Sequence, residues 1–196
     1  MNEPLTTRTV GEAVAIETDD DVMRWPIPQL IDFIVSTHHA YVRAAMPTIA
    51  SHLAQLNEVH GSRHTELSRV AAGFDQVRRD LEQHMIKEEQ VLFPYVRDLA
   101  ECSDSCGRTQ SPFGTVENPI RMMEREHHEI GDAMRIIREL THNYTPPEDG
   151  GTTYVNGMAE LQQFERDLHR HVHLENNVLF PAAIRIEQRL RGIAGD

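Results

Sequence analysis

Two stretches of the chain carry the same pattern of a histidine, a glutamate four residues later and a closing Val-Leu-Phe-Pro. They start at His84 and His171, lie 87 residues apart, and both read H-x-x-x-E-x-x-V-L-F-P. Residues four apart in a helix point within about 40° of each other, so each copy sets an imidazole beside a carboxylate, that of Glu88 or Glu175. Such nitrogen and oxygen ligands hold iron or manganese inside helix bundles. The repeat therefore predicts a two-metal site.

Four segments with helical spacing of apolar residues have to position these side chains. They run over about residues 30–56, 62–99, 119–141 and 153–190, and Gly- and Pro-rich breaks separate them. In the second segment the predicted inner stripe passes through Leu81, His84, Glu88, Val91 and Tyr95. Four amphipathic helices joined by short breaks predict an all-α protein, an antiparallel up-down four-helix bundle. Residues 1–25 are acidic and lack periodicity, which predicts a disordered tail before a bundle over 26–192 with a loop at 101–118.

Each predicted helix carries one histidine on its apolar stripe. These are His39, His84, His127 and His171, and in an up-down bundle all four fall near the same end. His38 is a close competitor of His39 for the first position. The seven remaining candidates lie off the stripes or at other levels, and surface or turn positions are expected for His52, His60, His64, His128, His142, His169 and His173. His169 and His173 form an i, i+4 pair, so a peripheral site on that face stays an alternative.

Histidine and glutamate side chains in the core of a bundle need partners that compensate their charges and hydrogen-bonding groups. An unpaired buried carboxylate costs several kcal/mol, and a buried imidazole also needs hydrogen bonds. Metal ions would compensate the carboxylates of Glu88 and Glu175 and occupy the nitrogen lone pairs of the histidines. The competing interpretation is a bundle whose histidines are structural, which predicts normal folding without metal.

Composition limits the other classes of function. The chain has 196 residues and a net charge of −12, which argues against nucleic acid and against an anionic membrane surface. No apolar run approaches the ~20 residues that span a bilayer, and the N-terminus lacks the apolar core of a signal peptide. Two cysteines, Cys102 and Cys106, are too few for a disulfide scaffold. A cytoplasmic protein is expected.

Longer motifs around these residues resemble the hemerythrin-like proteins, and among them the repair of iron centres family. The resemblance covers about residues 26–190 and is closest in Glu126-His-His-Glu-Ile-Gly131, in Leu140-Thr-His-Asn-Tyr-Thr-Pro-Pro147 and in residues 167–181. It implies a non-haem centre of two iron ions with an oxo or hydroxo bridge, although manganese accepts similar ligands. Carried over, Glu88 and Glu175 would bridge the ions, with His39, His84, His127 and His171 as terminal ligands.

Two departures from the family pattern matter. Oxygen-carrying hemerythrins use a fifth histidine one turn after the third-helix ligand, and this chain has Gly131 there, which disfavours oxygen carriage and predicts a more open iron site. Family members usually begin with a small domain bearing adjacent cysteines, and residues 1–25 contain none. Cys102 and Cys106 would substitute as a redox switch or metal relay, or they are an inert loop pair.

The resemblance implies a protein of the response to nitric oxide and oxidative damage that supplies iron to damaged iron–sulfur clusters or otherwise helps to restore them. The expected partners are iron–sulfur cluster proteins, small diatomic ligands such as nitric oxide or oxygen, and an electron donor that no motif identifies. One alternative is an enzyme that reduces nitric oxide or peroxide at the same centre. Another is a hemerythrin that binds or senses oxygen or nitric oxide.

Overall fold

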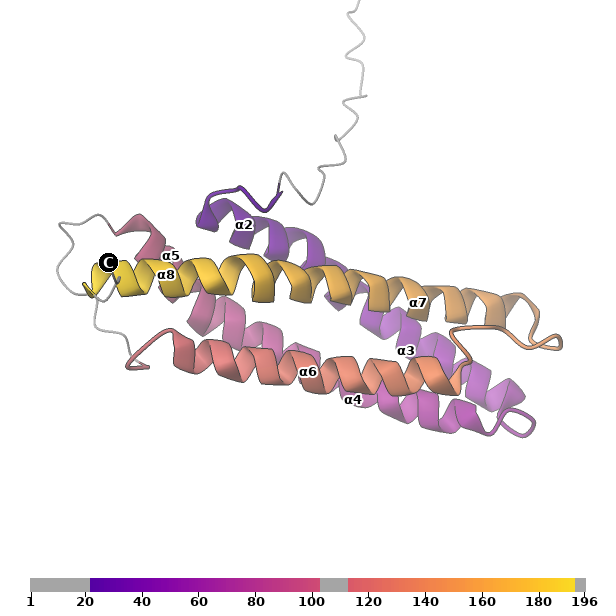
Figure 1. The fold of residues 1–196 in the computed structure, drawn as a ribbon. Helices are drawn as coiled ribbons and strands as arrows, with labels where there is room; N and C mark the ends of the chain where they lie inside the picture. The colour runs from indigo at the N-terminus through magenta and orange to yellow at the C-terminus, as the bar shows by residue number, and fades with distance from the viewer. Residues whose placement is uncertain (1–21, 103–112, 193–196) are drawn as a thin grey trace, which may run out of the picture.

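The computed structural model describes residues 22–102 and 113–192, and within them every regular element is a helix. These helices join end to end into rods that lie alongside one another and alternate in direction (Figure 1). The first rod consists of α2 (Ile27–Phe33), the π-helical turn η1 (Ile34–His39) and α3 (Ala40–His60). The second consists of α4 (Glu66–Lys87), η2 (Glu88–Leu92) and α5 (Phe93–Glu101), and the third is α6 (Glu117–Leu140). The fourth consists of α7 (Gly151–Leu174), η3 (Glu175–Leu179) and α8 (Phe180–Leu190), and the four together confirm the predicted antiparallel four-helix bundle.

Two apolar clusters form the core, one toward each end of the bundle. The larger cluster fills the α3, α4, α6 and α7 end, where the rings of Phe74 and Phe164 meet edge to face at 5.3 Å between centroids. The smaller cluster joins α2, α5 and α8 around Phe93 and Phe180. Burial of each such side chain contributes about 1.5–3 kcal/mol. In the second and fourth rods, the polar residues of the two repeats lie between these two apolar clusters.

Three π-helical turns interrupt the rods at the level of these polar residues. In η2 and η3 the backbone N–H groups of Phe93 and Phe180 donate to the carbonyls of Glu88 and Glu175, five residues earlier. The next residue in each copy is a proline, which has no N–H to continue the ordinary ladder. π-Helical turns of this kind are frequent at functional sites.

The extra residue in each π turn shifts the buried stripe by one position. Val91, expected on the inner stripe, is 45% exposed, whereas Leu92 is 1% exposed. The expectation for Val91 was wrong because it extended an unbroken period of 3.6 residues through η2. In the first rod, η1 has the same effect and buries Ile34, His38 and His39 together.

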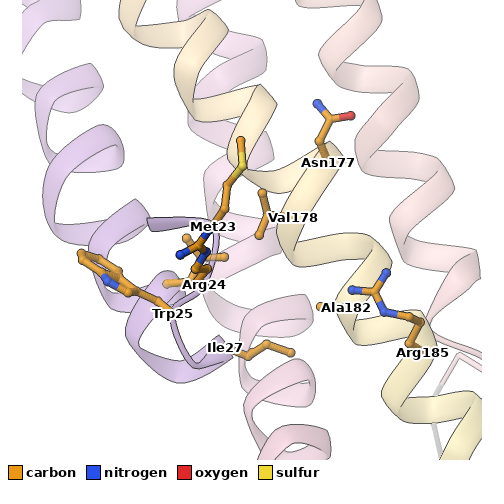
Figure 2. Close-up of a pocket in the computed structure, with 9 residues that line it drawn as sticks. Met23, Arg24, Trp25, Ile27, Asn177, Val178, Ala182 and Arg185 are labelled. Atoms are coloured by element: carbon orange, nitrogen blue, oxygen red, sulfur yellow. The ribbon is translucent and has the colours of Figure 1, made fainter. Parts of the chain in front are cut away.

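Packing on the first rod begins before residue 26. Val22 is fully buried in the smaller cluster, and Trp25 packs edge to face on Phe33 with 5.3 Å between ring centroids. This segment lines a hollow together with α2, η3 and α8, as Figure 2 shows, and the labelled side chains around it are Met23, Arg24, Trp25, Ile27, Asn177, Val178, Ala182 and Arg185. Residues 1–21 and 103–112, the latter with Cys106, lie outside the described residues. No helix of the described part is long and apolar enough to cross a membrane.

Candidate metal centre

The six predicted ligands meet in the middle of the bundle, one histidine from each rod and one glutamate from each repeat. Five of them are completely buried, and His127 is 5% exposed. The two glutamates begin η2 and η3, so the π turns start at the carboxylates themselves. The sequence therefore predicted every member of this cluster, and the competitor His38 is not part of it.

The cluster consists of two overlapping groups that share both glutamates. In the first group, ligand atoms of Glu88 and Glu175 lie with those of His39 and His171 within 4.8 Å of one another. In the second, His84 and His127 join the same two glutamates within the same distance. Each group offers two imidazole nitrogens and two carboxylate oxygens, a donor set suited to iron or manganese.

The two oxygens of each carboxylate face different groups. Oε2 of Glu88 lies 3.4 Å from Nε2 of His39, and Oε1 lies 3.3 Å from Nε2 of His84. Oε1 of Glu175 lies 2.9 Å from Nε2 of His171, while its Oε2 lies 3.2 Å from Nε2 of His127. Each glutamate can thus bind one ion in each group at the same time, which is the arrangement of a bridging carboxylate.

The donor atoms point at one another rather than at hydrogen-bond partners that would complete them. Nε2 of His39 lies 3.0 Å from Nε2 of His171, and Nε2 of His127 lies 2.9 Å from Nε2 of His84. Two imidazole nitrogens so close can both be satisfied only through a shared proton or a metal ion. Both oxygens of Glu88 and Oε2 of Glu175 are buried without a hydrogen bond. The residues present therefore fit a pair of metal ions.

The mutual electrostatics agree with a site built for cations. Burial alone would lower the pKa of His39 and of His84, but the carboxylates of Glu88 and Glu175, with Glu126 for His84, raise both to about 10. Burial would raise the pKa of Glu175, yet His171, His127 and His39 hold it well below its ordinary value. Without metal, the pocket keeps protons on the imidazoles of His39 and His84, and a metal ion would take their place.

Comparison with known proteins agrees with this geometry. Residues 30–183 match the family model described as the hemerythrin HHE cation binding domain. The chain belongs to the hemerythrin family. It is similar to proteins described as iron-sulfur cluster repair protein YtfE from Yersinia pseudotuberculosis serotype IB (strain PB1/+) and Yersinia pestis (strain Pestoides F). Each is 34% identical over 171 residues, which cover 87% of this chain and 72% of the relative, so the resemblance that the motifs indicated is confirmed.

Three histidines of this hemerythrin domain have an outer hydrogen bond that orients the ring. Nδ1 of His39 lies 2.6 Å from Glu89, Nδ1 of His84 lies 3.0 Å from Glu126, and Nδ1 of His127 lies 2.9 Å from Asn176. Such acceptors fix the tautomer that leaves Nε2 free for a metal. No sequence pattern indicated these three acceptors, although each is the direct chain neighbour of a predicted ligand.

Glu126 is the most strongly held of these acceptors. The hydrogen bond with His84 and the ammonium of Lys87, 2.5 Å from Oε1, lower the pKa of Glu126 to about 2. Its carboxylate therefore stays ionised at every physiological pH and keeps the Nδ1 proton of His84 in place.

Several of the other histidines contact residues that are not part of the metal-ligand cluster. His38 is buried beside it, with Nδ1 3.0 Å from Asp167. Further along the bundle, His52 pairs with Glu160 and His64 with Asp149, while the ring of His60 meets those of His64 and Tyr154 edge to face. His173 hydrogen-bonds Asn177 instead of forming a site with His169, and the described residues hold no metal-ligand group besides the two at the centre.

A groove between α6 and α7 reaches the one partly exposed candidate ligand. It has a volume of about 430 Å³, and its lining includes His127, Gly131, Glu165, His169 and Asn176. A Cβ atom added at Gly131 would meet nothing within 4 Å, so this position is open. The groove approaches the centre from the side of His127.

Proposed function

We propose that this hemerythrin domain binds two iron ions that share Glu88 and Glu175 as bridges. One ion would also be held by His39 and His171, and the other by His84 and His127. The observation that carries this proposal is the division of each carboxylate between the two groups, one oxygen to each. Bound iron would supply one-electron redox chemistry and coordination positions that the four protein ligands of each ion leave open. Manganese is the competing metal, because it accepts the same donors.

The function that fits this site best is repair of damaged iron–sulfur clusters by iron donation under nitrosative or oxidative stress. The similar Yersinia proteins carry the description of cluster repair, which supports the assignment. With two histidines and two shared carboxylates for each ion, exchange of ligands should be easier than at an ion whose coordination positions are all filled by the protein. The expected partners are iron–sulfur cluster proteins that have lost iron.

A transfer assay with labelled iron tests this function. The full chain would be loaded with ⁵⁷Fe²⁺, freed of unbound iron, and mixed with a dehydratase whose [4Fe–4S] cluster has been damaged by nitric oxide. Recovery of activity, with ⁵⁷Fe in the rebuilt cluster, is the expected result. The same amount of free Fe²⁺ without the chain is the control, and equal recovery there would contradict donation.

The groove at Gly131 favours two alternatives at the same site. One is reduction of nitric oxide or peroxide, and the other is simple binding of a diatomic ligand. An open approach on the side of His127 would admit such molecules. Reduction would need an electron donor of a kind that the sequence does not identify. Turnover with an added chemical reductant distinguishes the cases, because consumption beyond one equivalent per site requires an enzyme and a single equivalent requires only binding.

A further inference from the structure

Three buried polar atoms beside the centre have no hydrogen-bond partner. They are Nδ1 of His171, Nε2 of His38 and Oδ2 of Asp167. The rings of His38 and His171 lie within 9° of parallel, with 5.8 Å between their centroids, and Nδ1 of His38 already lies 3.0 Å from Oδ1 of Asp167. A buried polar atom without a partner costs about 1–3 kcal/mol. These three therefore need an explanation, which the metal ligands alone do not supply.

The two halves of the domain provide a comparison, because their outer hydrogen bonds correspond. Glu89 follows Glu88 in the chain and accepts from His39, and Asn176 follows Glu175 and pairs with His127 in the same way. The halves thus orient two of the four histidines with residues from equivalent positions.

The second pair of outer contacts breaks this equivalence. In one half Glu126, the residue before His127, holds Nδ1 of His84. The corresponding residue in the other half precedes His39 and is His38, so no carboxylate stands at that position. His171 is consequently the one candidate ligand whose Nδ1 has no acceptor.

Asp167 is placed to take over this role. It lies four residues before His171 on α7, and helical side chains lean toward the N-terminus, so the His171 ring lies over the turn that contains Asp167. Its Oδ1 is held by His38 and its Oδ2 is free. The equivalent aspartate of the first repeat, Asp80, is exposed and pairs with Gln76, since Glu126 already serves that half.

We infer that Asp167, oriented by His38, is the positioning residue for His171: Oδ2 of Asp167 accepts the Nδ1 proton when Nε2 binds metal. His38 replaces the glutamate of the other half and brings a carboxylate in from α7 instead. The inference rests on the proposed metal site. Loss of such an outer acceptor typically weakens metal binding by about 10–100-fold.

The full chain loaded with Co²⁺ tests the inference, because the paramagnetic ion shifts the N–H signals of bound imidazoles away from the other resonances. We expect one protected imidazole N–H signal per ligand histidine in the unmutated chain. Asp167→Ala should expose the His171 signal to rapid solvent exchange and weaken Co²⁺ binding in chelator competition about 10–100-fold. Adding His38→Glu to this variant should restore both, because it recreates the Glu126 arrangement.

Asp149→Ala is the matched control, since Asp149 pairs with His64 at the same 3.0 Å far from the centre. It should leave the signals and the affinity unchanged. Should Asp167→Ala fail to fold, Asp167→Leu keeps a side chain of similar size without an acceptor and carries the same test. Unchanged signals and affinity in a folded Asp167 variant would overturn the inference alone, whereas an unmutated chain that takes up no Co²⁺ would count against the proposed metal site itself.

Discussion

The N–H of Phe93 donates to the carbonyl of Glu88, five residues earlier, so the helix widens at the very residue that presents its carboxylate to the centre. Phe180 and Glu175 repeat this relationship in the fourth rod. The wider turn lets the carboxylate and the following apolar residue face inward within one rod. The closing Val-Leu-Phe-Pro of each repeat thus has a structural task, since its proline ends the ordinary ladder and its Leu-Phe pair packs beneath the site.

The one-residue shift of the buried stripe is testable by truncating two neighbours in η2. Leu92→Ala should lower the free energy of unfolding by about 2–5 kcal/mol, because it empties a fully packed position. Val91→Ala, at a position 45% exposed, should change it by less than about 0.5 kcal/mol. Urea unfolding of the metal-free chain measures both. A larger effect at Val91 than at Leu92 would contradict the π turn and support an unbroken α-helix through this segment.

The sequence was sufficient for the helices and for the six residues that meet in the central cluster, because both depend on local spacing. A histidine four residues before a glutamate on an apolar stripe places both side chains on the inner face of one helix. The second repeat places an equivalent pair on the inner face of another helix. The π turns were not predictable in this way, since a period of 3.6 residues was assumed throughout. That assumption explains the wrong placement of Val91 and the competition between His38 and His39, both of which η1 buries. The outer acceptors Glu126 and Asn176 depend on contacts between rods, which no single-helix pattern contains.

Removal of one of the two proposed bridging carboxylates should release metal from both groups. Glu175→Gln replaces an anion that faces His171 on one side and His127 on the other with a neutral amide. We expect iron content to fall from about two ions per chain to less than one, as measured by elemental analysis of the purified protein. Glu160→Gln is the control, since it removes a glutamate that pairs with His52 outside the centre. Retention of both ions in Glu175→Gln would exclude the bridge.

Metal binding should release protons at neutral pH. The pKa values of His39 and His84 are about 10 without metal, so both imidazoles carry an extra proton at pH 7 that a metal ion must displace. We expect release of about two protons per chain, and about one fewer in His39→Asn. Calorimetric titration in buffers of different ionisation enthalpy measures the number. No dependence on the buffer would contradict the protonated pocket.

The same two histidines set the stability of the metal-free chain at alkaline pH. Their pKa values are raised on folding, from an ordinary 6.5 to about 10, so their contribution is fully present below pH 6.5. It is lost as pH rises through 10. The thermal midpoint of the metal-free chain should therefore fall between pH 7 and pH 10, and metal-loaded protein should fall less. A flat profile for the metal-free chain would argue against these shifts.

Gly131 offers a way to separate access to the centre from its assembly. Gly131→Leu should fill the groove beside His127, because nothing lies within 4 Å of a Cβ at this position. Leucine also favours the helix by up to about 1 kcal/mol over glycine, so stability and iron content should hold or rise. Binding of azide to the iron-loaded protein, followed by absorption in stopped flow, should become slower. Ala54→Leu, an exposed small-to-large change on α3, controls for added bulk, and an unchanged azide rate in Gly131→Leu would show that ligands reach the metal by another path.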